Sequence, residues 1–505
     1  MLNHIFRYYI VIGISLFLLS NFQLTRGEPA FTMRHNGDSA NRVDLVILGD
    51  GYTESEMGKY GNDVENLVNG FFSQEPFKEY QNYFNVHRIE VISSESGADH
   101  PERGEFKDTV FNATYNCAGI QRLICVNISK VNDILANSLE FNQRDIILVI
   151  VNDSEYGGSG GAIAVASTHS AVVELVLHEI GHSFGHLADE YTSSPPTCNN
   201  TIEPFQPNVT METDRNLIKW NVGGGPPTGW IDFTTLIPTT DTTSGIPGLY
   251  EGAKYCLTGL YRPTRNSKMR CLFCPFEQIN EEALVKRIYN WVSPLDSRIP
   301  FDTDLLIQKG KNQLFQIEVP EPLTDPLDVI WNVNGEPQVS DLQFIIDTTN
   351  FDIGSHTVEV VIQDSTTKVR NDPLNLLTEN HIWNLQINTS SIVNDLVSLD
   401  KLKKSFSHIS VPGGQAGTIT ITATFTNTSS IPIDKPFLQV ITLSGENVLL
   451  NADGGAGEVG ATLTPDVGND HILSPGESVT VVFVIGLQTV NSFKLFVDLR
   501  GAIIP

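Results

Sequence analysis

The chain has 505 residues, of which 40% are hydrophobic and 18% are charged, and its formal net charge at pH 7 is −27. This composition is that of a globular protein, and the length predicts about two to four domains rather than one core. The strong negative charge argues against nucleic acid or an anionic membrane surface as a partner, because both would repel the chain.

Residues 1–27 have the pattern of a secretory signal peptide. Arg7 supplies a positive charge, and the apolar run that follows, from Tyr9 to Ser20, is 12 residues long. That length is short for a membrane span and typical of a signal sequence. We therefore expect a secreted, periplasmic or extracellular protein, with an uncleaved N-terminal anchor as the alternative. No later segment is apolar over enough residues to span a bilayer, so no stable membrane insertion is expected after signal cleavage.

The next region, residues 28–297, alternates strand-like and helix-like stretches, which predicts an α/β domain. Val43–Leu48, Phe84–Ile92 and Asp145–Val151 have the apolar pattern of buried or half-buried strands. After a glycine-rich stretch, Ala162–Ala166 is predicted to be an edge strand that holds extended substrate by main-chain pairing. A flexible turn is the alternative there. The glycines match no phosphate or dinucleotide loop, so no nucleotide cofactor is expected.

The stretch HEIGHSFGHLADEY, His178–Tyr191, contains the pattern His-Glu-x-x-His. Four residues separate His178 from His182, so on a helix both imidazoles lie on one face, within reach of one metal ion. Glu179 lies beside that metal, where it would take a proton from a zinc-activated water. The preceding apolar residues recur at helical spacing and place the histidines on the opposite, cleft-facing side. They are Val173, Val176, Leu177, Ile180 and Phe184.

Six cysteines lie in the first 280 residues, at positions 117, 125, 198, 256, 271 and 274. An even count in an exported chain favours structural disulfides. Cys117 and Cys125 are close enough for a local loop, but the pairing of the other four is left open. Cys271-x-x-Cys274 is also compatible with a second zinc site or a redox pair, although a four-cysteine zinc site would need another paired motif.

Three segments resemble the M64 family of secreted metallopeptidases, the group that includes bacterial IgA-cleaving endopeptidases. They are LGDGYT (Leu48–Thr53), the fourteen residues from His178 to Tyr191, and YRPTRNSKMRCLFCP (Tyr261–Pro275). The resemblance covers roughly residues 40–290. It implies a zinc endopeptidase with a metzincin-like α/β catalytic domain, but not IgA as the substrate. It also implies that Met269 forms a turn beneath the zinc.

Zinc needs a third protein ligand and an open position for water. The candidates are His186, Asp189 and Glu190. A straight helix would carry His186 out of reach, so we expect Gly185 to end the helix and turn the chain back to the metal. In metzincins the third ligand lies six residues after the second histidine, which is Ala188 here. The nearest carboxylate is one residue later, and we therefore predict Asp189 as the third ligand.

Two further side chains are candidates for the outer parts of the site. If Asp189 binds the metal, we expect Glu190 to orient one of the histidines. Tyr191 and Tyr261 are candidate donors to the oxyanion of the tetrahedral intermediate, although most tyrosines in such regions simply pack. His100 and His169 lie in the same domain and are expected to be surface or structural histidines.

After residue 300, alternating runs separated by turn residues predict two all-β, immunoglobulin-like sandwich domains. The first is predicted at residues 302–390 with Trp331 and Trp383 in its core, and the second at residues 410–505. Residues 391–408 are expected to be a linker with a helical turn. These domains carry no catalytic pattern. We expect an adhesive, spacer or substrate-presenting role, with surface or glycan contact as a further option.

Taken together, these patterns predict a secreted zinc endopeptidase that binds one catalytic Zn²⁺ and acts on protein or peptide substrates. Its metal ligands would be His178, His182 and Asp189, and Glu179 would be the general base. The alternative is a secreted adhesion or binding protein with an inactive metal-binding domain. The intact Glu179 favours the enzyme, because a purely structural metal site does not need it.

Overall fold

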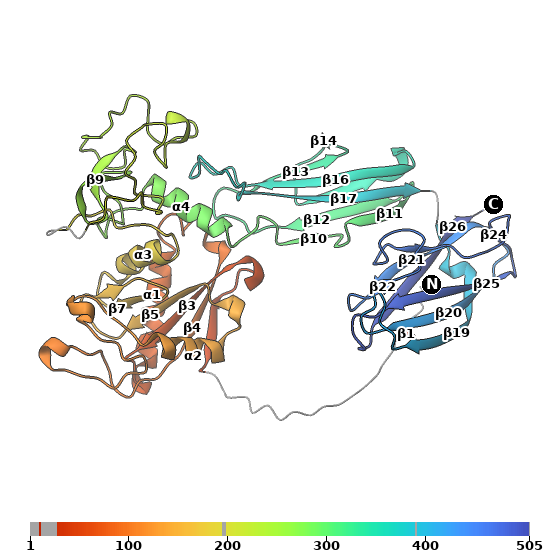
Figure 1. Cartoon of the computed structure of the whole chain (residues 1–505), viewed down its shortest axis with the longest axis horizontal. Helices are drawn as coiled ribbons and strands as arrows, with labels where there is room; N and C mark the ends of the chain where they lie inside the picture. The colour runs from red at the N-terminus through yellow and green to blue at the C-terminus, as the bar shows by residue number, and fades with distance from the viewer. Residues whose placement is uncertain (1–9, 12–27, 194–197, 389–390, 504–505) are drawn as a thin grey trace.

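A computed structural model of the chain describes residues 10–11, 28–193, 198–388 and 391–503 (Figure 1). The predicted signal peptide at residues 1–27 lies almost entirely outside these ranges. Within the described part, no helix is long and apolar enough to cross a membrane. An N-terminal α/β domain, red to green in Figure 1, is followed by two β-sheet units, cyan and blue.

A six-stranded mixed sheet forms the centre of the first domain, in the order β2-β4-β3-β5-β7-β6. The inner strands β4, β3, β5 and β7 are parallel, and the outer strands β2 and β6 are antiparallel to their neighbours. The strands are β2 (Ala30–Arg34), β3 (Val43–Asp50), β4 (Phe84–Ile89), β5 (Ile146–Val151), β6 (Gly158–Ser159) and β7 (Ala164–Ser167). Strand β3 is buried along its whole length, as expected for a parallel strand covered on both faces.

Helices cover both faces of this sheet. Helices α1 (Met57–Phe71), α3 (Val172–Ser183) and α4 (Gln278–Tyr289) share one core with the sheet, whereas α2 (Ile128–Ser138) packs into a separate core on the other face. Thr53 forms a capping box with Glu56, at the start of the turn that leads into α1.

A long, irregular segment joins α3 to α4 and contains the hairpin of β8 (Tyr250–Ala253) and β9 (Cys256–Arg262). The expectation of structural disulfides is confirmed, because the six cysteines pair as 117–125, 198–256 and 271–274. Short 3-10 turns occur throughout the chain, at η1 (Ser39–Asn41), η2 (Glu54–Glu56), η3 (Gln81–Tyr83), η4 (Pro101–Arg103), η5 (Cys117–Gly119), η6 (Phe141–Gln143), η7 (Val222–Gly224), η8 (Thr348–Asn350) and η9 (Asn394–Leu396).

The first β unit consists of two sheets, β10-β12-β15 and β11-β17-β16-β13-β14. Side chains from both sheets form its core, including the stacked rings of Trp331 and Trp383, whose centroids are 5.7 Å apart. Pairing is antiparallel except between β11 and β17. The strands are β10 (Ser297–Ile299), β11 (Asp304–Gln308), β12 (Asn312–Glu318), β13 (Asp328–Val333), β14 (Glu336–Pro337), β15 (Gln343–Asp347), β16 (Gly354–Gln363) and β17 (Thr378–Asn388).

The second β unit also has two antiparallel sheets around one core: β19-β20-β25-β22, and a sheet centred on β26 and β21. The linker predicted for residues 391–408 is wrong, because this stretch contains β18 and the eleven-residue strand β19 of the second unit. The strands are β18 (Ser391–Ile392), β19 (Val397–Ser407), β20 (Thr418–Asn427), β21 (Ile433–Leu443), β22 (Val448–Leu449), β23 (Thr462–Leu463), β24 (Ile472–Leu473), β25 (Ser478–Gly486) and β26 (Lys494–Ile503), and β1 (Ile10–Val11) pairs with β26. An immunoglobulin-like identity for the two units remains a prediction.

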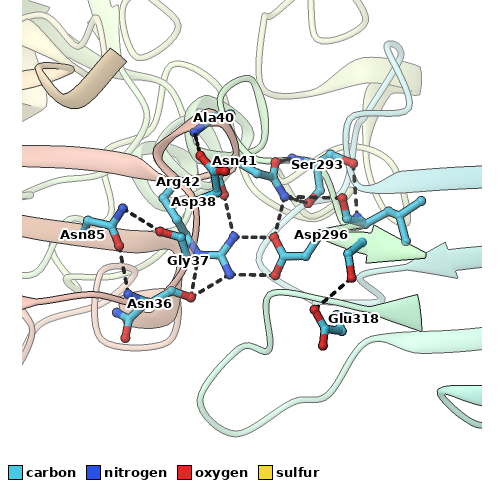
Figure 2. A network of polar contacts seen from close by, with 12 residues as sticks. Asn36, Gly37, Asp38, Ala40, Asn41, Arg42, Asn85, Ser293, Asp296 and Glu318 are labelled. Atoms are coloured by element: carbon cyan, nitrogen blue, oxygen red, sulfur yellow. Dashed lines mark hydrogen bonds and ion pairs between the residues drawn. The ribbon is translucent and has the colours of Figure 1, made fainter. Parts of the chain in front are cut away.

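Polar contacts fasten the first β unit to the α/β domain (Figure 2). Arg42, at the start of β3, makes a two-pronged ion pair with Asp296, just before β10, with distances of 2.5 and 2.7 Å. Asn41 donates a further hydrogen bond to the same carboxylate at 2.7 Å. Arg42 is only 4% exposed, so this pair holds the junction in one arrangement.

Candidate active site

Helix α3 presents two histidines and a glutamate to a cleft. Its buried side chains Leu175, Val176, Leu177 and Ile180 belong to the core on the sheet, which fixes the rotation of the helix. The opposite face carries His178, Glu179 and His182, and all three line a cleft of about 780 Å³. The imidazole centroids of the two histidines are 4.7 Å apart. The spacing of the sequence motif is therefore realised on one helix face.

Asp189 completes a triangle of possible metal-binding atoms with the two histidines. The Nε2 atoms of His178 and His182 lie 3.2 Å apart, and each lies 3.2 Å from Asp189 Oδ1. Tetrahedral zinc with bonds of about 2.0–2.1 Å would separate its ligand atoms by about 3.3 Å. Asp189 Oδ1 is buried and accepts no hydrogen bond from any described residue. The donor set and its spacing therefore fit a zinc ion.

Backbone carbonyls fix the orientation of both imidazoles. The Nδ1 of His178 donates to the carbonyl oxygen of Lys268 at 3.0 Å, and the Nδ1 of His182 donates to that of Leu187 at 2.8 Å. With Nδ1 as the donor, each Nε2 carries a lone pair that points to the shared centre. Burial lowers the pKa of His182, but Asp189 outweighs burial and raises that pKa to about 9. The centre thus favours a positive charge.

The turn after α3 differs in detail from the expectation. His186, not Gly185, adopts the left-handed conformation, with φ of 53°. The amide of Leu187 then donates to the carbonyl oxygen of Gly181 at 2.9 Å, a bond across the helix end that is typical of a Schellman motif. Gly185 is required for space, because a Cβ there would lie 2.7 Å from Leu284 Cδ2. His186 is exposed and lies outside the triangle.

Tyr255 contacts the triangle from the irregular segment, and sequence reasoning missed it. Its hydroxyl donates to Oδ2 of Asp189, which leaves Oδ1 of that carboxylate facing the histidines. Lys254 and Tyr255 both have positive φ, and their amides donate to the carbonyl oxygens of Asp189 and Tyr191 at 2.9 and 3.0 Å. Two strained residues at the turn of the β8–β9 hairpin thus place the hydroxyl. No sequence signal links position 255 to position 189.

Glu190 does not orient a histidine, so that expectation was wrong. Its carboxylate is fully buried and accepts hydrogen bonds from Asn208 at 3.0 Å, Asn280 at 2.9 Å and Ser267 at 2.7 Å. Burial raises its pKa. Asn208 also bonds both backbone groups of Ala188, at 2.8 and 2.9 Å. These contacts hold the backbone on both sides of Asp189 and thereby fix its direction.

Met269 is fully buried in the core and packs against Gly181 of α3, the residue before His182. A Cβ on Gly181 would lie 2.6 Å from the Met269 sulfur, so glycine gives the sulfur its space there. Its carbonyl oxygen accepts from the amide of Glu190 at 2.8 Å. Tyr191 lines the cleft and its ring contacts that of Tyr255, whereas Tyr261 lies outside the cleft.

The opposite wall of the cleft comes from the glycine-rich segment. The expected edge strand at Ala162–Ala166 is β7 in the structure, but β7 lies inside the sheet, and the short strand β6 forms the edge. The cleft is lined by Gly158, Ser159, Gly160 and Gly161. A Cβ on Gly160 would lie 2.4 Å from Glu179 Oε2, so a larger residue there would displace that carboxylate. Burial raises the pKa of Glu179.

Acidic residues also surround His100, outside this cleft. His100 is buried, stacks on Tyr115 and pairs through Nε2 with Asp153 at 2.9 Å. Its Nδ1 lies 3.4 Å from Glu102 and 3.7 Å from Glu155. These atoms are close enough to share a cation. However, Arg103 already pairs with Glu155 at 2.9 Å, so we interpret His100 as a structural histidine.

An α/β domain whose helix carries two histidines and a glutamate beside a facing carboxylate defines the metallopeptidase class. Residues 31–236 match the family model described as IgA Peptidase M64, a family of metallopeptidases. A search of curated proteins finds no match.

Solved structures resemble the chain only weakly. They include a quinonprotein alcohol dehydrogenase-like protein from Bacteroides thetaiotaomicron (11% identity, 26% of this chain and 23% of that one, TM-score 0.14). A chitinase from Bacillus thuringiensis matches at 9% identity over 50% and 43% of the two chains, with a TM-score of 0.16. A β-glucuronidase from Bacteroides uniformis matches at 11% over 90% and 52%, with a TM-score of 0.17. The chain thus spans 23–52% of these proteins, and scores this low define no common fold.

Proposed function

We propose that this chain is a secreted zinc endopeptidase that hydrolyses peptide bonds in protein substrates. The observation that carries the proposal is the triangle of His178 Nε2, His182 Nε2 and Asp189 Oδ1, with mutual distances of 3.2 Å, beside Glu179 in an open cleft. Two imidazoles and one carboxylate are a donor set that suits zinc and leaves one position open.

His178, His182 and Asp189 would hold the zinc ion. When bound, zinc supplies a Lewis acid that polarises the scissile carbonyl and lowers the pKa of the attacking water. With the metal bound, both histidines would bind it as neutral imidazoles through Nε2, while their Nδ1 atoms donate to the carbonyl oxygens of Lys268 and Leu187.

Glu179 moves the proton. Its carboxylate accepts a proton as water attacks the peptide carbonyl, and the same carboxyl group then donates a proton to the leaving amine. Burial raises the pKa of Glu179, which makes its carboxylate a stronger base toward the attacking water. Tyr191, which lines the cleft, would donate a hydrogen bond to the developing oxyanion.

The glycine-rich wall supports an extended peptide as the substrate. Strand β6 is the antiparallel edge of the sheet, and Gly160 and Gly161 continue from it along the cleft. Extended peptides commonly bind by adding a strand to such an edge. The three disulfides support an exported protein, because reduced cytosolic compartments rarely retain them. The two β units would act as spacers or present the substrate.

The test is a comparison of wild type with Glu179→Gln for zinc content and casein cleavage. We expect one zinc per chain in both proteins, cleavage by wild type alone, loss of that cleavage with a chelator, and recovery with added zinc. Full cleavage by Glu179→Gln would refute the role of Glu179. Bound zinc without hydrolysis of any tested protein by wild type would favour a binding or adhesion protein instead.

A further inference from the structure

Three cationic side chains line the cleft beside the proposed metal centre: Arg122, Lys254 and Arg270. They are unusual in a chain with 59 acidic and 32 basic residues. Among the residues that the structure describes, none of the three forms an ion pair with a carboxylate. By contrast, Lys268 in the same cleft is buried and neutralised by Glu174. An acidic protein that keeps unpaired cations in one cleft attracts negative charge to that place.

Arg122 belongs to the wall formed by the disulfide loop and strand β6. The Cys117–Cys125 disulfide closes this loop, and the carbonyl oxygen of Arg122 accepts from the amide of Gly158 at 3.1 Å. The Arg122 side chain is exposed. Arg122 and Glu179 line the same cleft.

Lys254 and Arg270 belong to the opposite wall, formed by segments that bond to the backbone after α3. The Lys254 amide donates to the carbonyl oxygen of Asp189 at 2.9 Å, and its Nζ donates to the amide oxygen of Gln206 at 3.1 Å. Arg270 donates to the carbonyl oxygen of Glu190 at 3.2 Å. Neutral acceptors thus position both side chains without neutralising them.

The carboxylates of the cleft are already committed. Asp189 faces the two histidines, and Glu179 would hold or move the proton. With a divalent metal bound, the metal and these two carboxylates sum to zero, so the three cations leave the cleft positively charged. The negative groups that balance them must come from whatever enters the cleft.

We propose that the cleft selects peptides with acidic side chains near the scissile bond, which Arg122, Lys254 and Arg270 would contact. This inference rests on the proposed peptidase function. The same carboxylate chemistry could come from the C-terminus of a substrate. A single terminal carboxylate would balance only one of the three cations, which is why side chains are the source inferred here.

The first test maps cleavage sites in a mixed peptide library by mass spectrometry. Wild type should enrich Asp and Glu near the cleaved bond. Each of Arg122→Gln, Lys254→Gln and Arg270→Gln should reduce that enrichment about two- to fivefold. Lys107→Gln, an exposed lysine outside the cleft, is the matched control and should leave activity and enrichment unchanged. Uniform cleavage by wild type would overturn the proposal.

Charge reversal separates recognition from damage to the fold. Arg122→Glu should shift part of the preference toward Lys and Arg, a gain that a merely misfolded variant cannot show. The acidic preference of wild type should also weaken as ionic strength rises. Cleavage confined to bonds near free C-termini, lost when those termini are amidated, would assign the cations to a terminal carboxylate and overturn the side-chain proposal.

A binding measurement keeps the inference separate from catalysis. Zinc-loaded Glu179→Gln is titrated with a labelled, amidated peptide that has glutamate at alternate positions, and with its glutamine counterpart. Tighter binding of the glutamate peptide, reduced by Arg270→Gln, supports the inference even if wild type hydrolyses nothing. Equal binding of the two peptides would overturn it, and hydrolysis without acidic preference would leave only the peptidase proposal standing.

Discussion

Removing the Tyr255 hydroxyl should weaken metal binding without disturbing the fold. This hydroxyl donates to Oδ2 of Asp189, whose other oxygen faces the histidines. A hydrogen bond to a charged acceptor contributes about 1.5–3 kcal/mol, and contacts of this kind to metal-binding carboxylates change metal affinity about 10- to 100-fold. Tyr255→Phe should therefore raise the zinc dissociation constant by about 10- to 100-fold, or about 1.4–2.7 kcal/mol.

The assay is competition for zinc against a chromophoric chelator, followed by kcat/KM at saturating zinc. Tyr261→Phe is the matched control, because Tyr261 lies on the following strand, β9, but outside the cleft. Its zinc affinity should equal that of wild type. An unchanged dissociation constant for Tyr255→Phe would show that the hydroxyl does not position Asp189. A loss of thermal stability equal to the loss of affinity would show damage to the hairpin instead.

Two further predictions concern the scaffold. Arg42→Ala should lower the free energy of unfolding by about 2–4 kcal/mol, since it leaves Asp296 at the junction without its partner. By chemical denaturation, the Arg42→Ala, Asp296→Ala double variant should lose less free energy of unfolding than the two single variants lose together. Losses that simply add would contradict an energetic coupling between Arg42 and Asp296. Burial, reinforced by the charge of Asp44, raises the pKa of Asp145 to about 6. Its protonated form therefore stabilises the fold below about pH 4, and that contribution is lost as the pH rises through 6. In Asp145→Asn, the free energy of unfolding should change less between pH 4 and 6 than it does in wild type. The same pH dependence in both proteins would refute the role of Asp145.

The helix of the site could be predicted because the sequence pattern that indicates it lies within one short segment. The apolar stripe before His178 and the four-residue spacing to His182 are properties of one short segment, and they fix the helix face directly. Asp189 could be proposed for the same reason. The prediction for the turn was wrong by one residue, because His186 and not Gly185 has the positive φ. Glycine at position 185 instead avoids a clash with Leu284.

Features that depend on distant partners could not be predicted. Tyr255 reaches Asp189 across 66 positions, through a hairpin turn with two residues at positive φ. Strand β19 was mistaken for a linker because it forms an exposed sheet edge, so its residues do not alternate between apolar and polar. Its lysines at positions 401, 403 and 404 suit an edge that must not pair with another chain. The sequence pattern of an edge strand is therefore weaker than that of a buried one.

The buried carboxylate of Glu190 sets an order of events during the biosynthesis of this protein. Its partners Asn208, Ser267 and Asn280 lie up to 90 positions downstream. During synthesis, the histidine helix is therefore made well before the residues that aim Asp189. The proposed metal site would reach its full affinity only after residue 280 has been added.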